Sequence, residues 1–221
     1  MCKTVKKLMP CAPWYIGELE CWFSDMAKKG LILDEFDWIS AKFYKEEPAE
    51  LRFRIDIIQN PDKAQEQIDL YAESGWGFAA KYGEYYVYAS YTENEDPELH
   101  TDPAEQAFTI KKYIRKSTIY FLLSQVVLLP VIIFIVPLHF KQFAEGNYIG
   151  LWYWVLPIVA GVACIKELVS LRIIKRRLSE GQPINHSAPW KKKRRRRIAS
   201  VCLVVLSCIA VIVLEFVLPL N

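Results

Sequence analysis

The sequence predicts an α+β domain that is followed by three membrane-spanning helices. Two observations indicate this class. In the first 92 residues, apolar positions change between helical and strand spacing in the order strand, helix, strand, strand, helix, strand. Beyond them, three runs are apolar over about 20 residues each, the length that crosses a hydrocarbon core of ~30 Å. The predicted parts are a domain at 1–92, an acidic linker and juxtamembrane helix at 93–116, and a transmembrane region at 117–221.

The chain is expected to begin with a short strand at 2–8 and an amphipathic helix. Pro13 suits the first turn of this helix, and Gly30 fits the position just past its end. The apolar face of the helix has the expected spacing and consists of Tyr15, Leu19, Trp22, Phe23 and Met26. The acidic residues of the helix are expected to face water, and they are Glu18, Glu20 and Asp25.

Two strands are expected after the first helix. Beyond Gly30 the apolar period changes to two, and residues 31–44 are interpreted as a single strand. Residues 51–57 alternate apolar and charged side chains, with Arg52 and Arg54 on the charged side. This alternation is the clearest amphipathic strand pattern in the chain.

A second helix and a hairpin complete the predicted domain. Residues 60–62, Asn-Pro-Asp, are a strong helix start, and Gly75 ends the helix. Residues 76–81 and 84–91 flank a short turn and form an aromatic hairpin. The result is the ferredoxin-like βαββαβ pattern with one additional hairpin arm, in which both helices cover one face of an antiparallel sheet.

The other face of that sheet is predicted to be open and to bind a protein partner. Its candidate residues are two arginines and three aromatic residues, namely Arg52, Arg54, Trp76, Tyr86 and Tyr88. Nucleic acid is not expected there, because residues 1–110 carry 11 Lys/Arg against 21 Asp/Glu, and this excess of acid repels phosphate. The alternative is that this face packs on the membrane surface, on the linker or on a second copy of the chain.

The charge pattern predicts how the membrane region is oriented. The three apolar segments are 117–138, 149–171 and 198–218. Residues 111–221 carry 17 Lys/Arg and 4 Asp/Glu, and the loop 172–197 is especially basic. Because basic loops stay on the cytoplasmic side of a membrane, the prediction is a multi-pass cell-membrane protein with a cytoplasmic N-terminus and an extracellular C-terminus.

Consecutive cations end that basic loop, directly before the third apolar segment. They are predicted to anchor the chain at an anionic inner leaflet and to draw the acidic domain or its linker onto the loop. The run consists of Lys191, Lys192, Lys193, Arg194, Arg195, Arg196 and Arg197. Within the third segment Glu215 is the acid that stands out, and it either reaches the outer interface or has a functional role.

No pattern of catalytic or metal-binding residues is present in the sequence. None of the cysteines forms a C-x-x-C pair, and no Ser-His-Asp pattern or glycine-rich phosphate loop occurs. The histidines lie in expected loops without a second ligand at metal spacing, and they are His100, His139 and His186. The sequence therefore predicts a protein that is not an enzyme and that uses no cofactor.

Several short patterns between residues 21 and 91 resemble a known family. They are Cys21-Trp22-Phe23 with Lys28-Lys29-Gly30-Leu31, then Phe36-Asp37-Trp38, Arg52-Phe53-Arg54-Ile55-Asp56 and Glu73-Ser74-Gly75-Trp76. In these patterns the chain resembles the DUF2812 family of bacterial membrane proteins from Firmicutes. The resemblance implies no catalytic residue, because no activity is established for the family. Its members are often encoded beside PadR-type transcription regulators, which implies a regulatory role.

The favoured hypothesis is a membrane-anchored regulatory or interaction protein whose cytoplasmic domain binds a protein partner, with a PadR-type regulator or a transporter as candidates. The alternative is an accessory subunit of a membrane transport system or of a small-ligand or lipid-handling system. Nucleic-acid binding through 191–197 is disfavoured, because Ile198 places those cations beside an apolar segment. The expected partners are an anionic bilayer and a protein, and a homo-oligomer is left open.

Overall fold

The computed structural model describes residues 4–58, 60–91, 99, 106–123, 126, 152–199 and 201–202. The chain divides into a first unit, residues 1–113 with 171–197, and a second unit, residues 114–170 with 198–221. The elements of the first unit are β1 (Thr4–Leu8), α1 (Ile16–Ala27), β2 (Leu31–Phe36), β3 (Ser40–Lys45), β4 (Leu51–Ile57), a 3₁₀ turn η1 (Pro61–Lys63), α2 (Ala64–Glu73), β5 (Gly77–Tyr82) and β6 (Tyr85–Tyr91). Residues 106–123 are helical, and α4 (Trp152–Ser179) is a long helix that contributes to both units.

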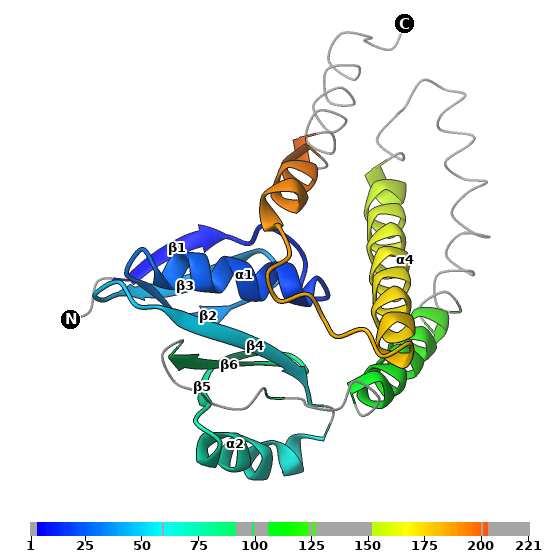
Figure 1. The fold of residues 1–221 in the computed structure, drawn as a ribbon. Coiled ribbons are helices and arrows are strands. Elements are labelled where there is room, and N and C mark those ends of the chain that lie inside the picture. Colours follow the sequence, from blue (N-terminus) through cyan, green and yellow to red (C-terminus); the bar gives the residue numbers. More distant parts are fainter. Residues whose placement is uncertain are drawn as a thin grey trace, which may run out of the picture. The chain divides into compact units, whose positions relative to one another are not determined.

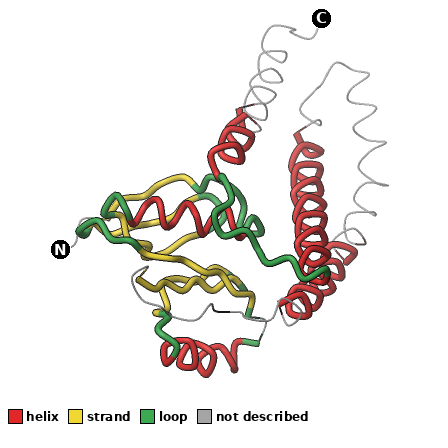
Figure 2. The backbone as a smooth tube through the Cα atoms, in the orientation of Figure 1, coloured by secondary structure: helices red, strands yellow, loops and turns green. Residues whose placement is uncertain are grey.

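The strands of the first unit form two antiparallel sheets, each built by one βαββ half of the domain (Figures 1 and 2). In the first sheet β3 lies between β1 and β2, and in the second sheet β6 lies between β4 and β5. Element order and strand order are therefore the same in both halves. Each helix joins two parallel strands that an antiparallel third strand separates, which is a split βαβ arrangement.

The expected ferredoxin-like βαββαβ sheet is wrong, because residues 31–44 form a hairpin and not one strand. β2 ends at Phe36 and β3 begins at Ser40. Asp37 makes the turn, since its Oδ1 accepts hydrogen bonds from the backbone N–H of Ile39 at 2.6 Å and of Ser40 at 2.7 Å. An aspartate that binds the backbone just after itself is a common turn former. Apolar residues alternate with polar ones on both sides of Asp37, so the sequence pattern does not indicate the turn.

The two helices lie on opposite faces of the second sheet, which also differs from the expectation. Phe23 of α1 packs against Phe53 of β4, with ring centroids 5.8 Å apart. Tyr71 of α2 packs against Tyr88 of β6 at 4.9 Å. Successive side chains of a strand point to opposite faces, and Tyr88 is paired with Arg54, the neighbour of Phe53. Phe53 and Tyr88 therefore lie on opposite faces, each under its own helix.

β2 and β5, the neighbouring edge strands of the two sheets, share one further irregularity. Each strand has a bulge, at Asp34 between Leu33 and Glu35 in β2 and at Ala79 between Phe78 and Ala80 in β5. The rings of Phe36 and Tyr82, at the ends of these strands, lie 5.8 Å apart. The two halves thus meet along a pair of bulged strands.

Gly30 and Gly75 hold corresponding places after α1 and α2. Both have positive φ angles, 71° and 85°, which side chains with a Cβ rarely adopt. A Cβ at Gly30 would also lie 2.3 Å from the carbonyl oxygen of Glu46. Glycine is therefore required where α1 turns into β2.

The structure corrects the predicted membrane region. In the part of the chain that the structure describes, no helix is both long enough and apolar enough to cross a membrane. α4 contains most of the predicted segment 149–171, but Lys166 and Glu167 interrupt its apolar sequence, and it continues into the basic residues before Ser179. This finding overturns the three spanning helices and the multi-pass location. Most of 117–138 and 198–218 lies outside the described residues, as does Glu215.

Candidate functional site

The candidate site is the surface of α1 together with a C-terminal stretch that packs on it, residues 184–197, called here the basic segment. Residues 190–199 are helical and are called the basic helix. Both lie in the first unit up to residue 197. Three carboxylates of α1 contact the basic segment, and these are Glu18, Glu20 and Asp25. All three were expected to face water.

Glu20 is the buried member of this group, with an exposed fraction of 2%. Its Oε1 accepts a hydrogen bond from the backbone N–H of Ile55 at 2.8 Å, and its Oε2 lies 2.5 Å from His186 Nδ1. Ile55 belongs to β4, an edge strand whose outward N–H groups need partners. A buried carboxylate is costly unless it is hydrogen-bonded. Glu20 therefore closes the edge of β4 on one side and holds the basic segment on the other.

Three residues on one side of the basic helix contact the N-terminal domain. Trp190 Nε1 donates to Asp25 Oδ2 at 2.8 Å. Lys193 Nζ lies 3.7 Å from Glu18 Oε1 and 3.7 Å from the centre of the Tyr15 ring. The spacing of 190, 193 and 197 places these residues on one helix face.

Arg197 is the last of these contacts. Its guanidinium donates to the carbonyl oxygens of Cys11 at 2.7 Å and of Trp38 at 2.6 Å. Burial lowers the pKa of Arg197 and raises that of the neighbouring Cys11 thiol. Because arginine stays protonated in proteins, this group remains a charged donor that fixes the helix to the loops after β1 and β2.

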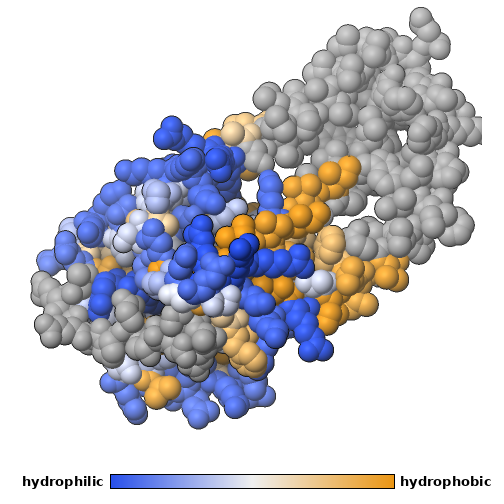
Figure 3. All heavy atoms as spheres, turned by 45° about the vertical axis from the view of Figure 1, so that its right-hand side comes forward, coloured by the Kyte–Doolittle hydropathy of each residue, from blue (hydrophilic) through white to orange (hydrophobic). Residues whose placement is uncertain are grey.

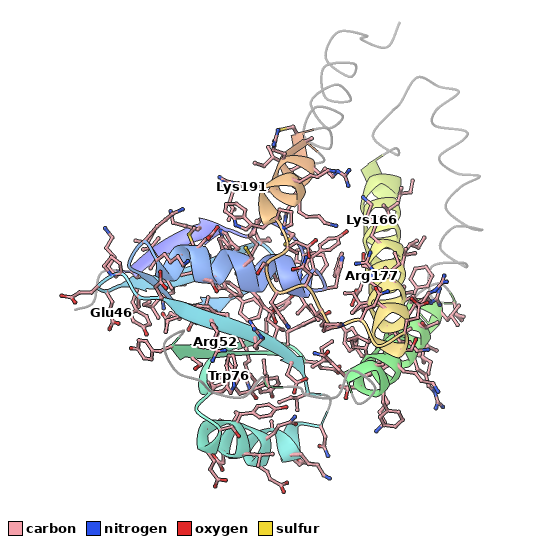
Figure 4. All side chains as sticks on the ribbon, viewed as in Figure 1. Glu46, Arg52, Trp76, Lys166, Arg177 and Lys191 are labelled. Atoms are coloured by element: carbon pink, nitrogen blue, oxygen red, sulfur yellow. The ribbon has the colours of Figure 1, made fainter. Side chains whose placement is uncertain are left out.

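The other cations of the basic helix are exposed, and they are Lys191, Lys192, Arg194, Arg195 and Arg196. Figure 4 labels Lys191 at the start of this helix. In Figure 3 hydrophilic residues cover much of the described surface that this view presents. The basic helix therefore has one face bound to the domain and one face that presents positive charge. The sequence prediction treated all seven cations as one membrane anchor and did not separate those that contact the domain from those that stay exposed.

Gly17 lets the basic segment approach α1 closely. A Cβ at this position would lie 2.1 Å from the carbonyl oxygen of Asn185, inside any allowed contact. Glycine in a helix is otherwise less stable than alanine. Its place in the first turn of α1 is thus explained by the backbone of Asn185, which lies where a side chain would be.

The five residues predicted to bind a partner are brought together, but beneath α2. Arg52 and Arg54 lie over the Trp76 ring, with guanidinium carbons 5.3 Å and 5.7 Å from its centre. Figure 4 labels Arg52 and Trp76. Trp76 and Tyr88 are both 0% exposed, and Tyr86 is buried with them in the cluster that α2 covers. This face packs within the domain.

Sequence reasoning missed the polar centre of that cluster. Asp56 is buried, and its Oδ2 accepts hydrogen bonds from Gln67 Nε2 at 3.0 Å and from the Tyr71 hydroxyl at 3.1 Å. Burial, and then the charge of Asp56, raise the pKa of both Tyr71 and Tyr88. These tyrosines are therefore protonated at neutral pH. The only signal in the sequence was an acid on the charged side of the 51–57 strand.

The pairing of His186 with Glu20 was also missed. The two residues are far apart in the chain, and neither belongs to a motif that would connect them. His100 and His139 lie outside the described residues. A contact of this kind depends on the return of the chain to α1, which local spacing does not reveal.

A protein-family model matches the larger part of the domain. Residues 16–123 match the model of a family described as "Protein of unknown function (DUF2812)". No curated protein and no solved structure matches the chain. The family match starts at the first residue of α1 and includes all elements from α1 to β6, whereas the basic segment lies beyond it. Through residues 16–123, the chain is similar to the DUF2812 family.

Proposed function

We propose that this protein is a regulatory interaction protein that binds an acidic segment of a protein partner through the outward face of the basic helix. The observation that carries the proposal is the division of that helix into two faces. Trp190, Lys193 and Arg197 hold it to the domain, and the other five cations of the helix stay exposed. The proposal assigns no catalytic step to the protein.

A helix that is already ordered favours binding. Ordering of flexible segments is one of the costs of association, and a helix fixed at three points loses less freedom when a partner arrives. The charges are also close together, so that they attract an acidic surface from a distance and orient it. The contacts of Lys193 and Arg197 with the domain thus support the role of their exposed neighbours.

A protein is favoured over nucleic acid because of the surroundings of the helix. The α1 surface beside it is acidic, and residues 1–110 carry 21 Asp/Glu against 11 Lys/Arg. A duplex has dense negative charge along its whole length and is repelled by such a surface. A protein can present a local acidic patch that contacts the basic helix alone.

The family resemblance adds a candidate. If the chain is bacterial, as the resemblance to Firmicutes proteins implies, a PadR-type transcription regulator encoded beside it is the first partner to test. We infer this candidate from the resemblance alone, and the contacts of the basic helix support only the chemistry of an acidic protein segment.

A binding measurement with the full chain tests the proposal. The probe is a fluorescent peptide of ten glutamates, and the readout is its anisotropy at two salt concentrations. In the test variant the exposed cations become glutamine: K191Q, K192Q, R194Q, R195Q and R196Q. We expect its affinity to fall by at least about tenfold, and the wild-type affinity to fall with salt.

The control variant loses the same number of cations elsewhere, through K28Q, K29Q, K45Q, K63Q and K111Q. Its affinity should stay within about twofold of wild type, because these lysines are spread over the surface and do not form one face. An equal loss in both variants would contradict the proposal. Tighter binding of duplex DNA or of anionic vesicles than of the peptide would also overturn it.

A further inference from the structure

A cleft of about 500 Å³ lies on the first sheet, on the face opposite to α1. Phe43 of β3 packs on Trp22 of α1, with ring centroids 5.4 Å apart. Its neighbour Lys42, and Lys6 opposite Lys42 on β1, therefore point to the other face. β5 of the second sheet forms the far wall of the cleft. α2 packs on the second sheet, and the face of the first sheet that carries Lys6 and Lys42 lines the cleft.

The two bulges shape the cleft. In a regular strand Asp34 and Glu35 would point to opposite faces, but the bulge at Asp34 lets both reach one partner. Lys42 Nζ lies 2.9 Å from Asp34 Oδ2 and 3.7 Å from Glu35 Oε2. The corresponding bulge in β5 carries Ala79, whose small side chain leaves the space open. The bulge of the first half thus positions two carboxylates at the cleft, and the bulge of the second half leaves space beside them.

The side chains around the cleft offer three kinds of contact. Lys6 and Lys81 also line it and carry positive charge. Glu35 lines the cleft as well, and its exposed carboxylate can accept hydrogen bonds. Phe78 lines the cleft with 43% of its surface exposed, although a large aromatic residue is more often buried. Amines, a carboxylate and an apolar ring therefore face one small volume.

We propose that this cleft binds a zwitterionic ligand of amino-acid to dipeptide size. The carboxylate of the ligand would lie near the amines of Lys6 and Lys81, its ammonium near Glu35, and its apolar side chain on the ring of Phe78. The volume is within the range of small-molecule sites, and a few charged groups on its walls fix the orientation of a ligand. This site is separate from the basic helix and does not depend on the function proposed for it.

Isothermal titration of the full chain with three forms of one dipeptide tests the proposal. The probes are glycyl-phenylalanine, its N-acetyl form and its C-terminal amide. The free dipeptide has both charges, and each modified form lacks one. We expect the free dipeptide to bind, and each modified form to bind at least about tenfold more weakly. Absence of binding by the free dipeptide, or equal binding of all three forms, overturns the proposal.

Two variants locate the binding. Ala79→Leu fills the cleft without removing a charge and should abolish binding. Lys45→Gln removes an exposed lysine from the end of β3, outside the cleft, and should leave affinity within about twofold of wild type. Circular dichroism of both variants shows whether the fold is retained. Unchanged binding to a folded Ala79→Leu variant would place the ligand elsewhere and reject this site.

Discussion

The two βαββ halves have the same topology, but their sheets are covered differently. In the second half α2 packs on the sheet, and the face beneath it contains Trp76, Tyr86 and Tyr88. The first sheet packs on α1 with one face, and its other face carries Lys6, Lys42 and the cleft. An aromatic strand face therefore indicates a covering helix as readily as it indicates a binding surface.

The helices of the two halves also differ in how much of their surface is buried. α1 has eight buried residues among twelve, and α2 has two among ten. α1 packs on strands of both sheets and also receives the basic segment, so that even Glu20 is buried. α2 has a single packed side. We therefore expect substitutions on α1 to have larger effects than those on α2.

The largest expected effect comes from Phe23→Ala in α1. Phe23 is 0% exposed and contacts the rings of Phe36 and Phe53. Its removal leaves a cavity between the halves and should lower the free energy of unfolding by about 3–5 kcal/mol. Urea denaturation measures the change. Leu70→Ala on α2, where Leu70 is 58% exposed, is the control and should change that free energy by about 0.5 kcal/mol or less. Similar losses at both sites would remove the distinction between the helices.

Gly17→Ala is expected to have an intermediate effect and tests the second packed side of α1. The new Cβ would overlap the carbonyl oxygen of Asn185, so the basic segment must move away. Overpacking of this kind costs about 1–3 kcal/mol. Released cations at 191–197 should be cut by trypsin about tenfold faster than in wild type.

The matched control for this experiment is Gly161→Ala in α4, where the new Cβ meets nothing within 4 Å beyond its chain neighbours and the backbone of its own helix. Alanine is the better helix former, so this change should stabilise the helix or leave it unaffected. If trypsin cuts the Gly17→Ala variant at the wild-type rate, the close contact between α1 and the basic segment is not present in solution.

The smallest expected effect concerns the turn that separates β2 from β3. The backbone N–H groups of Ser40 and Ile39 hold the pKa of Asp37 below its usual value. A lowered pKa means that the carboxylate stabilises the fold above its unfolded pKa, and that this contribution is lost as the pH falls through the folded pKa. Asp37→Ala should cost about 1 kcal/mol at pH 7.

The difference between Asp37→Ala and wild type should begin to shrink as the pH falls below about 4, where this aspartate becomes protonated in the unfolded chain, and should be lost as the pH falls through the lower folded pKa. Urea unfolding at several pH values provides the measurement. Glu47→Ala, an exposed acid beyond β3, serves as the control and should show no such trend. A difference that stays constant down to low pH would assign the loss to the methylene and backbone of Asp37, and not to its charge.

Sequence reasoning worked where a structure depends on neighbouring residues. The helical face of α1, the amphipathic strand at 51–57 and the hairpin at 76–91 all follow from local spacing, and they are present. It failed at Asp37, because the alternating pattern of apolar residues is the same before and after this turn. The pattern alone therefore looks like one continuous strand. It also failed at the three apolar segments, where length and composition suggested spanning helices and the described helices do not support them.

The candidate site was predicted only in part. The charged run at 191–197 was recognised, and its attraction to the acidic domain was expected. Which cations contact the domain was decided by the helix at 190–199, which turns Trp190, Lys193 and Arg197 to one side. The sequence did not indicate that His186 contacts Glu20 or that Glu20 is buried, because both depend on a residue distant in the chain.

The sequence by itself determined the local elements of this protein, its division of charge and its family resemblance, because these depend on composition and on spacing within a few residues. Only the tertiary structure decided which sheet face is covered and which cations of the basic helix stay exposed. The physical reason is that burial is a property of packed neighbours. Tyr88 of β6 and Lys42 of β3 both lie on central strands of three-stranded sheets, but α2 covers the face of Tyr88, whereas the face of Lys42 lines a cleft.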